Sequence, residues 1–361
     1  MQVKVQQDID EKSKKAYVVN LSFPWVRTAF CLLSAFLCCI LAALIGSVTI
    51  APDAAVAITF SRLPFIEIEN DWPISWNIIL WELRYPRIAL AMLVGAALSV
   101  SGATYQGLFR NPLADPYLIG VASGAALGAT IVFLSGIPSV IAGVSILPIA
   151  AFIGGFGAVT AAYTLARRST GTPLTTLILA GVAIGSFTTA VASILMLRSD
   201  PDLRPILSWL MGGFIRAQWS QSLYLLPYLI LGFTVVFTYS RILNAMQLEE
   251  EYASSVGVNV EKTKKILILT ATVITAAAVS FSGLIGFVGL VAPHTARLIW
   301  GSDFRNLLPM SALLGGCFLV LSDLVARTIV SPGELPVGII TSLVGAPFFI
   351  YLLVRNRSNI K

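Results

Sequence analysis

Ten stretches of about 20 consecutive, mostly apolar residues constrain the fold of this chain more than any other feature of its sequence. A helix needs about 20 such residues to cross the hydrocarbon core of a membrane. Because the stretches are continuous rather than alternating, they predict an all-α, polytopic membrane protein and exclude a transmembrane barrel. The predicted spans lie near residues 29–50, 88–109, 117–135, 147–166, 174–197, 222–240, 265–281, 284–300, 307–326 and 337–354.

The seventh and eighth spans are separated only by Ser282 and Gly283. Residues 266–300 are too long for a single crossing, so we expect two helices joined by a tight turn. The first span is also too long for a cleavable signal peptide and follows a 28-residue polar segment.

The composition supports the same class of protein. The chain is 57% hydrophobic and only 12% charged, whereas a soluble domain carries about 25% charged residues. So little charge cannot cover a soluble globule, which excludes an ordinary cytosolic enzyme and a disordered chain. The net charge of +6 forms no basic face, because the basic residues lie between apolar stretches. We therefore expect membrane lipid, and no nucleic acid, as a partner.

The distribution of lysine and arginine predicts the orientation. With a cytoplasmic N-terminus and ten spans, 17 of the 24 basic residues fall inside and 7 outside. This bias predicts that both termini lie in the cytoplasm and that the protein resides in the cytoplasmic (inner) membrane of a bacterium. The expected domains are a tail at 1–28, a transmembrane domain at 29–355 and a second tail at 356–361.

The sequence offers little for catalysis or metal binding. It has no GxxxxGK[ST] phosphate loop. Its single histidine, His294, has no acidic or cysteine cluster beside it, and we expect it to be a structural residue hydrogen-bonded at a helix end. The four cysteines lie in apolar spans without disulfide-like spacing, so we interpret them as small residues of the helix contacts. We predict no catalytic residue and no metal site.

The longest inner connection, about 241–264, contains a pattern for a short helix. Three glutamates, 249–251, precede an apolar periodicity, and Gly257 follows it. Acidic residues favour a helix start and glycine a helix end. The pattern Glu251-x-Ala253-x-x-x-Gly257 resembles the cytoplasmic coupling motif of ABC-importer permeases, where such a helix docks on an ATP-binding subunit. The alternative is an ordinary solvated loop.

Three further segments carry a more specific resemblance. They are RYPR at 84–87, GLIGFVGLVAPHTAR at 283–297 and ELPVGIITSLVGAPFF at 334–349. Together they resemble the FecCD family, the permeases of ABC importers for ferric siderophores, haem and cobalamin. The resemblance runs from about Arg84 to Arg355.

The resemblance implies a type II ABC-importer permease fold with ten helices and a translocation path at the interface of a homodimer or close heterodimer. It implies two ATP-binding subunits, which carry ATP and magnesium, so no cofactor is expected on this chain and the chain is not itself an enzyme. It also implies an extracytoplasmic substrate-binding protein. Ferric siderophore is the expected cargo, with haem or cobalamin as alternatives.

The resemblance also suggests a role for particular residues. Outward arginines of the family meet glutamates of the binding protein, and the matching positions are Arg84, Arg87 and Arg327. The planar guanidinium group suits such carboxylate pairing. Alternatively, Arg84 and Arg87 anchor a helix end at the headgroups, and Arg327 only pairs with Asp323, four residues before it.

On the inner side, the residues predicted to couple to the ATP-binding subunit are Glu250, Glu251, Ala253 and Gly257. The segment before the fifth span resembles the cytoplasmic gate of the family, with the candidates Thr172, Thr175 and Thr176. The alternative role for these threonines is helix N-capping.

Three rival functions remain at this point. A stand-alone secondary carrier or channel is disfavoured because ionisable groups are scarce at the centres of the spans. An integral-membrane enzyme would need a polar cluster facing one cavity. A permease for free metal ions or another nutrient is disfavoured by the three segments quoted above.

Overall fold

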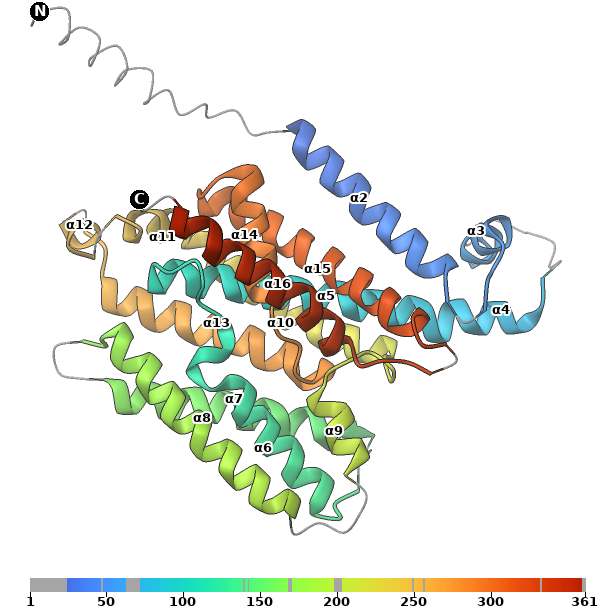
Figure 1. Ribbon diagram of the computed structural model, residues 1–361, viewed down its shortest axis with the longest axis horizontal. Helices are drawn as coiled ribbons and strands as arrows, with labels where there is room; N and C mark the ends of the chain where they lie inside the picture. Colours follow the sequence, from blue (N-terminus) through green and yellow to red (C-terminus); the bar gives the residue numbers. More distant parts are fainter. Residues whose placement is uncertain are drawn as a thin grey trace, which may run out of the picture.

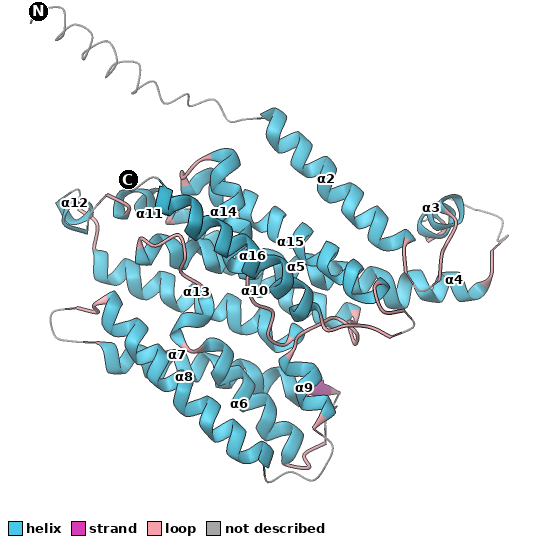
Figure 2. Cartoon of the chain, in the orientation of Figure 1, coloured by secondary structure: helices cyan, strands magenta, loops and turns pink. Residues whose placement is uncertain are grey.

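The computed structural model describes residues 25–46, 48–62, 72–138, 140–141, 143–167, 171–197, 203–248, 250–255, 257–331 and 333–358. The predicted tail at 1–28 and the end of the tail at 356–361 lie largely outside these residues. The fold is all-α, as predicted, and a bundle of long helices forms its body (Figures 1 and 2). The long helices are α2 (Trp25–Leu44), α5 (Tyr85–Phe109), α6 (Val121–Leu134), α7 (Ile146–Ala166), α8 (Leu174–Leu197), α10 (Trp219–Thr238), α13 (Val260–Ser282), α14 (Val288–Trp300), α15 (Phe304–Thr328) and α16 (Val337–Ser358).

Each predicted span overlaps one of these helices. Within the described residues, seven helical segments are long and apolar enough to cross a membrane, namely α2, residues 74–109, α7, α8, α10, α13 and α15. The apolar helices α6 and α16 are shorter by this measure. The seventh and eighth spans are separate helices, as expected. Their connection is longer than a tight turn, because α14 begins only at Val288.

The helix of the second predicted span begins much earlier than its apolar run. A continuous helical segment covers residues 74–109, made of α4 (Ile74–Ile78), the π-helix η1 (Ile79–Arg84) and α5. Pro86 lies at the start of α5 and has no N–H to donate. The wider π turn directly before it lets the chain remain helical across this position. The predicted start of this span, at residue 88, is therefore too late, because the helix also includes the charged residues Glu82 and Arg84.

Helix α5 is the centre of the bundle and packs against α10, α13, α14 and α15. Glycines permit the close approach between α5 and α15. A Cβ atom on Gly95 would lie 2.2 Å from the carbonyl oxygen of Gly315, so the two backbones are in direct contact there. Contacts between small residues are typical of membrane helices.

Short elements connect the long helices at their ends. They are α3 (Pro52–Phe60), η2 (Pro116–Ile119), α9 (Arg204–Leu210), α11 (Ser240–Met246), α12 (Glu250–Ser255) and a two-stranded antiparallel hairpin of β1 (Val140–Ile141) and β2 (Val144–Ser145). In the hairpin, Val140 pairs with Ser145 and Ile141 with Val144. Figure 1 shows α12 at the opposite end of the bundle from α3 and α4. The predicted orientation makes the α12 end cytoplasmic.

Candidate functional site

The short helix predicted between the sixth and seventh spans exists, as α12. It begins at Glu250 and ends at Ser255, and Gly257 follows with a φ of +88°. The amide of Gly257 donates to the carbonyl of Ser254, and that of Val258 to Ala253, which closes the helix end. Glycine favours this left-handed conformation because it has no Cβ. The solvated-loop alternative is therefore wrong for residues 250–255.

The predicted coupling residues lie on different faces of α12. Glu251 and Gly257 are exposed, whereas Ala253 is fully buried. Ala253 therefore holds the helix against the bundle, as a member of the apolar periodicity of this segment, and its predicted contact with an ATP-binding subunit stays a prediction. The carboxylate of Glu250 is half-buried and lies 2.7 Å from the Nζ of Lys264 on α13.

The three threonines of the predicted gate lie at the start of α8. Thr172 is buried, and its backbone amide donates to the Glu261 carboxylate of α13 at 2.9 Å. Helix α8 begins at Leu174, so Thr175 and Thr176 are in its first turn. The capping alternative is thus wrong for these two residues. Thr175 is exposed.

A polar cluster around Asp303 holds the start of α15 in place. Asp303 accepts hydrogen bonds from the Arg305 amide at 3.0 Å and from Asn244 Nδ2 of α11 at 2.8 Å. Its hydrogen bond with the Arg305 guanidinium lowers the pKa of Asp303 to about 2, despite partial desolvation. Because the pKa of Asp303 is lowered in the folded state, its ionised form stabilises the fold. This stabilisation is fully present above the unfolded pKa of about 4 and is lost as the pH falls through the folded pKa of about 2.

At the outer end, Arg87 is buried between two carboxylates. Its Nε lies 2.8 Å from both oxygens of Asp323 on α15, and its Nη1 lies 2.8 Å and 3.1 Å from the oxygens of Glu334. Arg87 and Asp323 are almost fully buried, while the Glu334 side chain is 33% exposed. The cluster joins α5, α15 and the segment that precedes α16.

Arg84 and Arg327 cap the C-terminal end of α2. Arg84 Nη1 donates to the carbonyls of Ala43 at 2.6 Å and Leu44 at 2.9 Å, and Arg327 donates to the carbonyl of Ala42. The last carbonyls of a helix lack partners within it, and a cation there also interacts favourably with the helix dipole. Arg327 Nε lies 3.9 Å from Asp323 as well.

The three arginines predicted to dock a binding protein are thus all buried and have partners within this chain. Arg84 is buried against the end of α2, which differs from the alternative of anchoring a helix end at the headgroups. Arg327 lies near Asp323, as the other alternative expected, but this is not its only contact, because it also holds α2. Arg87 is different, because one of its partners, Glu334, reaches the surface. The docking role itself stays a prediction.

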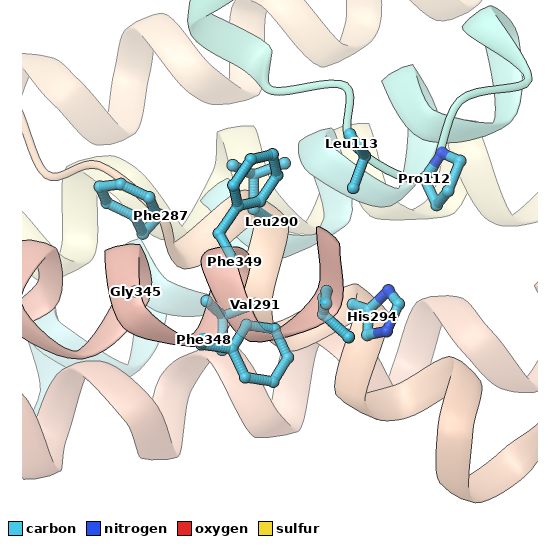
Figure 3. Close-up of a pocket in the computed structure, with 10 residues that line it drawn as sticks. Pro112, Leu113, Phe287, Leu290, Val291, His294, Gly345, Phe348 and Phe349 are labelled. Carbon is cyan, nitrogen blue, oxygen red and sulfur yellow. The ribbon is translucent and has the colours of Figure 1, made fainter. Parts of the chain in front are cut away.

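An enclosed pocket beside His294 is too small for a cargo. It has a volume of about 10 Å³, enough for roughly one water molecule. Figure 3 shows its lining from α14, α16 and the segment after α5, with the His294 ring beside Phe348. Among the described residues, the buried His294 Nδ1 has no hydrogen-bond partner. The predicted helix-end hydrogen bond is therefore absent at this atom.

A wider hollow of about 770 Å³ lies between the η2–α6 segment and α8. Small residues form most of its lining, among them Gly120, Ala122, Gly181 and Gly185. Asp115, at the entry to η2, also borders it and accepts a hydrogen bond from the Tyr117 amide at 2.7 Å. The hollow is open to its surroundings, and its lining is mostly small and apolar.

Sequence reasoning missed Lys264 and Glu334 as candidate functional residues. Lys264 is one of three lysines within residues 262–265, and its neighbours Lys262 and Lys265 are exposed. Only its spacing of three residues from Glu261 hinted at a pair. Glu334 was quoted as part of a motif, but nothing local indicates that it pairs with a residue more than 200 positions away.

The comparison with protein families now decides the class of this protein. The model of the FecCD transport family matches residues 32–355, nearly the whole described chain. The chain belongs to the FecCD transport family. This agrees with the resemblance of the three sequence segments.

Two relatives illustrate the range of this family. The chain is 47% identical to the cobalamin import system permease protein BtuC of Halobacterium salinarum, over 79% of this chain and 75% of that protein. It is 44% identical to the hemin transport system permease protein HmuU of Yersinia pestis, over 79% and 87% of the two chains.

A solved structure described as an inward-facing conformation of a metal-chelate type ABC transporter matches with a TM-score of 0.78 and 30% identity, over 92% of this chain and all of that one. The relatives are permease subunits of ABC importers, which are transport components rather than enzymes. The chain is thus a polytopic protein of the cytoplasmic membrane with the ABC-importer permease fold.

Proposed function

We propose that this chain is the permease subunit of an ATP-driven importer that moves a large metal chelate, ferric siderophore in the first place, across the cytoplasmic membrane. The observation that carries the proposal is the exposed α12, with Glu251 on its outer face, in a member of a family of importer permeases. Haem and cobalamin are the alternative cargoes, since relatives are named for both.

In this proposal two ATP-binding subunits attach beneath the membrane and contact α12 through Glu251 and the exposed backbone around Gly257. ATP binding on those subunits displaces α12, and a pair of permease copies alternates between outward-open and inward-open states. Such a change is a two-state equilibrium biased by a distant ligand. The open, weakly polar hollow beside α8 suits a cargo that is handed over rather than tightly bound.

An extracytoplasmic binding protein docks at the opposite end. Arg87 is the arginine best placed to take part, because a carboxylate of the binding protein can replace the partly exposed Glu334 as its partner. Arg84 and Arg327 contribute to this surface by holding the end of α2.

Reconstitution tests the proposed function. The permease is placed in liposomes with its ATP-binding subunits and its binding protein, and uptake of a ferric siderophore, haem and cobalamin is measured separately. We expect uptake of one chelate that needs both ATP and the binding protein. Uptake driven by an ion gradient without ATP would instead establish a secondary carrier.

The end of α12 provides a second test. Gly257→Val is expected to abolish ATP-dependent uptake, because a β-branched residue at a φ of +88° costs about 1–2 kcal/mol and misplaces α12. Among the described residues, no atom lies within 4 Å of an added Cβ, so the expected effect comes mainly from the backbone conformation. Gly257→Asn is the matched control, since asparagine tolerates this conformation. Full uptake by Gly257→Val would contradict the assignment of α12 as the coupling element.

A further inference from the structure

A lysine is buried at the cytoplasmic start of α13, directly behind α12. The Lys264 side chain is only 4% exposed, and lysine is almost never buried without a charged partner. Its Nζ lies 2.7 Å from Glu250 Oε2 on α12 and 3.2 Å from Glu261 Oε1 on its own helix. The ammonium group therefore connects the two carboxylates.

Each of these carboxylates also contacts another part of the bundle. The second oxygen of Glu250 lies 3.9 Å from the Nη2 of Arg110, the residue that follows α5. The second oxygen of Glu261 accepts the backbone amide of Thr172 at 2.9 Å. Two cations and two anions thus link α12 with α13, with the end of α5 and with the start of α8.

The contact between Glu261 and the segment before α8 is close. A Cβ atom on Gly171 would lie 2.9 Å from both Cδ and Oε1 of Glu261, so only glycine brings the backbone this near without displacing the carboxylate. The φ of Gly171 is +125°, which also favours glycine. Thr172 is buried directly beside it. A shift of the Glu261 carboxylate therefore acts on the backbone of residues 171–172.

In the described structure, Glu250 is the α12 residue that forms ion pairs with the rest of the bundle. The partner Lys264 has almost no access to water, so separating the pair leaves a buried charge without full compensation. Removing one member of a buried pair is far more costly than losing an exposed ion pair. When α12 moves, keeping Lys264 paired is therefore favoured over breaking the contact.

We propose that Glu250, Lys264 and Glu261 form a relay that transmits displacement of α12 to residues 171–176 at the start of α8. The proposal rests on the proposed function, because it requires α12 to be displaced by an ATP-binding subunit. It gives Glu250 a role different from that of Glu251, which faces the solvent. It also explains how movement at the cytoplasmic surface reaches the predicted gate at Thr172, Thr175 and Thr176.

The first test needs no partner. Amide hydrogen exchange of Thr172 and Leu177, whose amides have described acceptors at the start of α8, is measured on the full chain in nanodiscs for the wild type, Glu250→Gln and Lys264→Met. No described hydrogen bond or ion pair joins Glu250 to these residues, yet we expect Glu250→Gln to speed their exchange about fivefold or more. The matched control is Glu251→Gln, on the same helix but facing away, which leaves the exchange unchanged. Unchanged exchange in Glu250→Gln overturns the relay.

The second test uses the assembled transporter and measures chelate transported per ATP hydrolysed. We expect Lys264→Met to lower this ratio about 5- to 100-fold, and the exposed Lys265→Met to leave it within about twofold. Glu250→Gln, with its partly exposed side chain, is the variant that retains the fold. When Glu250→Gln is combined with Lys264→Met, we expect no further decrease in the ratio of chelate transported per ATP, because both substitutions break the same ion pair.

The outcomes separate the two proposals. If Lys264→Met lowers only the thermal stability while the ratio is unchanged, Lys264 is merely structural and the relay is wrong. If the wild type shows no ATP-driven uptake of any chelate, the proposed function fails. In that case the hydrogen-exchange result still decides whether α12 and the start of α8 are connected.

Discussion

Replacing Gly95 by alanine is expected to lower the free energy of unfolding by about 3 kcal/mol, at the upper end of the usual cost of overpacking. The added Cβ would lie 2.2 Å from the carbonyl oxygen and 2.5 Å from the carbonyl carbon of Gly315. These are backbone atoms, so no rotamer change relieves the clash and α5 and α15 must separate. Denaturant unfolding of the purified chain in detergent measures the effect.

Gly157 provides the control for this substitution. It also lies within a long helix, α7, but no atom would approach an added Cβ within 4 Å. Alanine has the higher helix propensity, by about 1 kcal/mol, so we expect Gly157→Ala to be neutral or slightly stabilising. Equal destabilisation by both substitutions would show that the contact between α5 and α15 is not as close as described.

Replacing Arg87 by methionine is expected to cost about 3–5 kcal/mol of stability, since it leaves the buried Asp323 carboxylate without its main partner. Glu334 loses its ion pair in the same variant and can turn to the solvent. Thermal unfolding in detergent measures the loss. Adding Asp323→Asn is expected to recover part of it, because the unpaired charge is then removed.

Arg216→Met serves as the control, because Arg216 also lies on the predicted outer side but is exposed. We expect its unfolding to match that of the wild type. The same variants discriminate between the roles of Arg87. Unchanged stability of Arg87→Met, together with weaker binding of the extracytoplasmic protein, would make docking its main role and would contradict the structural one.

Most of the helices could be predicted from hydropathy because each apolar run is a local property of the chain. The predicted helix boundaries are wrong where polar residues form part of a helix. Helix α13 starts at Val260, with the Asn259 side chain accepting the Lys262 amide at 3.0 Å, five residues before the predicted span. The charged Glu261, Lys262 and Lys264 lie before the start of the predicted span, although the cap and the contacts of this turn keep it helical.

The candidate site was predicted less completely. The α12 helix and its glycine end were predicted because acidic starts and glycine ends act within a few residues. The direction in which each α12 side chain points was not predicted, so the buried Ala253 and the exposed Glu251 were named together as coupling residues. The arginines were predicted to face a partner protein, and their partners within the chain were recognised only for Arg327.

By itself the sequence determined the class of protein, the approximate positions of its helices and the family, and it predicted the orientation in the membrane. All of these depend on composition, on short motifs or on the position of charge along the chain. Only the tertiary structure decided which charges pair. Arg87 and Asp323 are 236 residues apart, and Glu261 and Thr172 are 89 apart. Burial of a charge is stable only when its partner is brought to it, and that partner is supplied by helix contacts which no local pattern records.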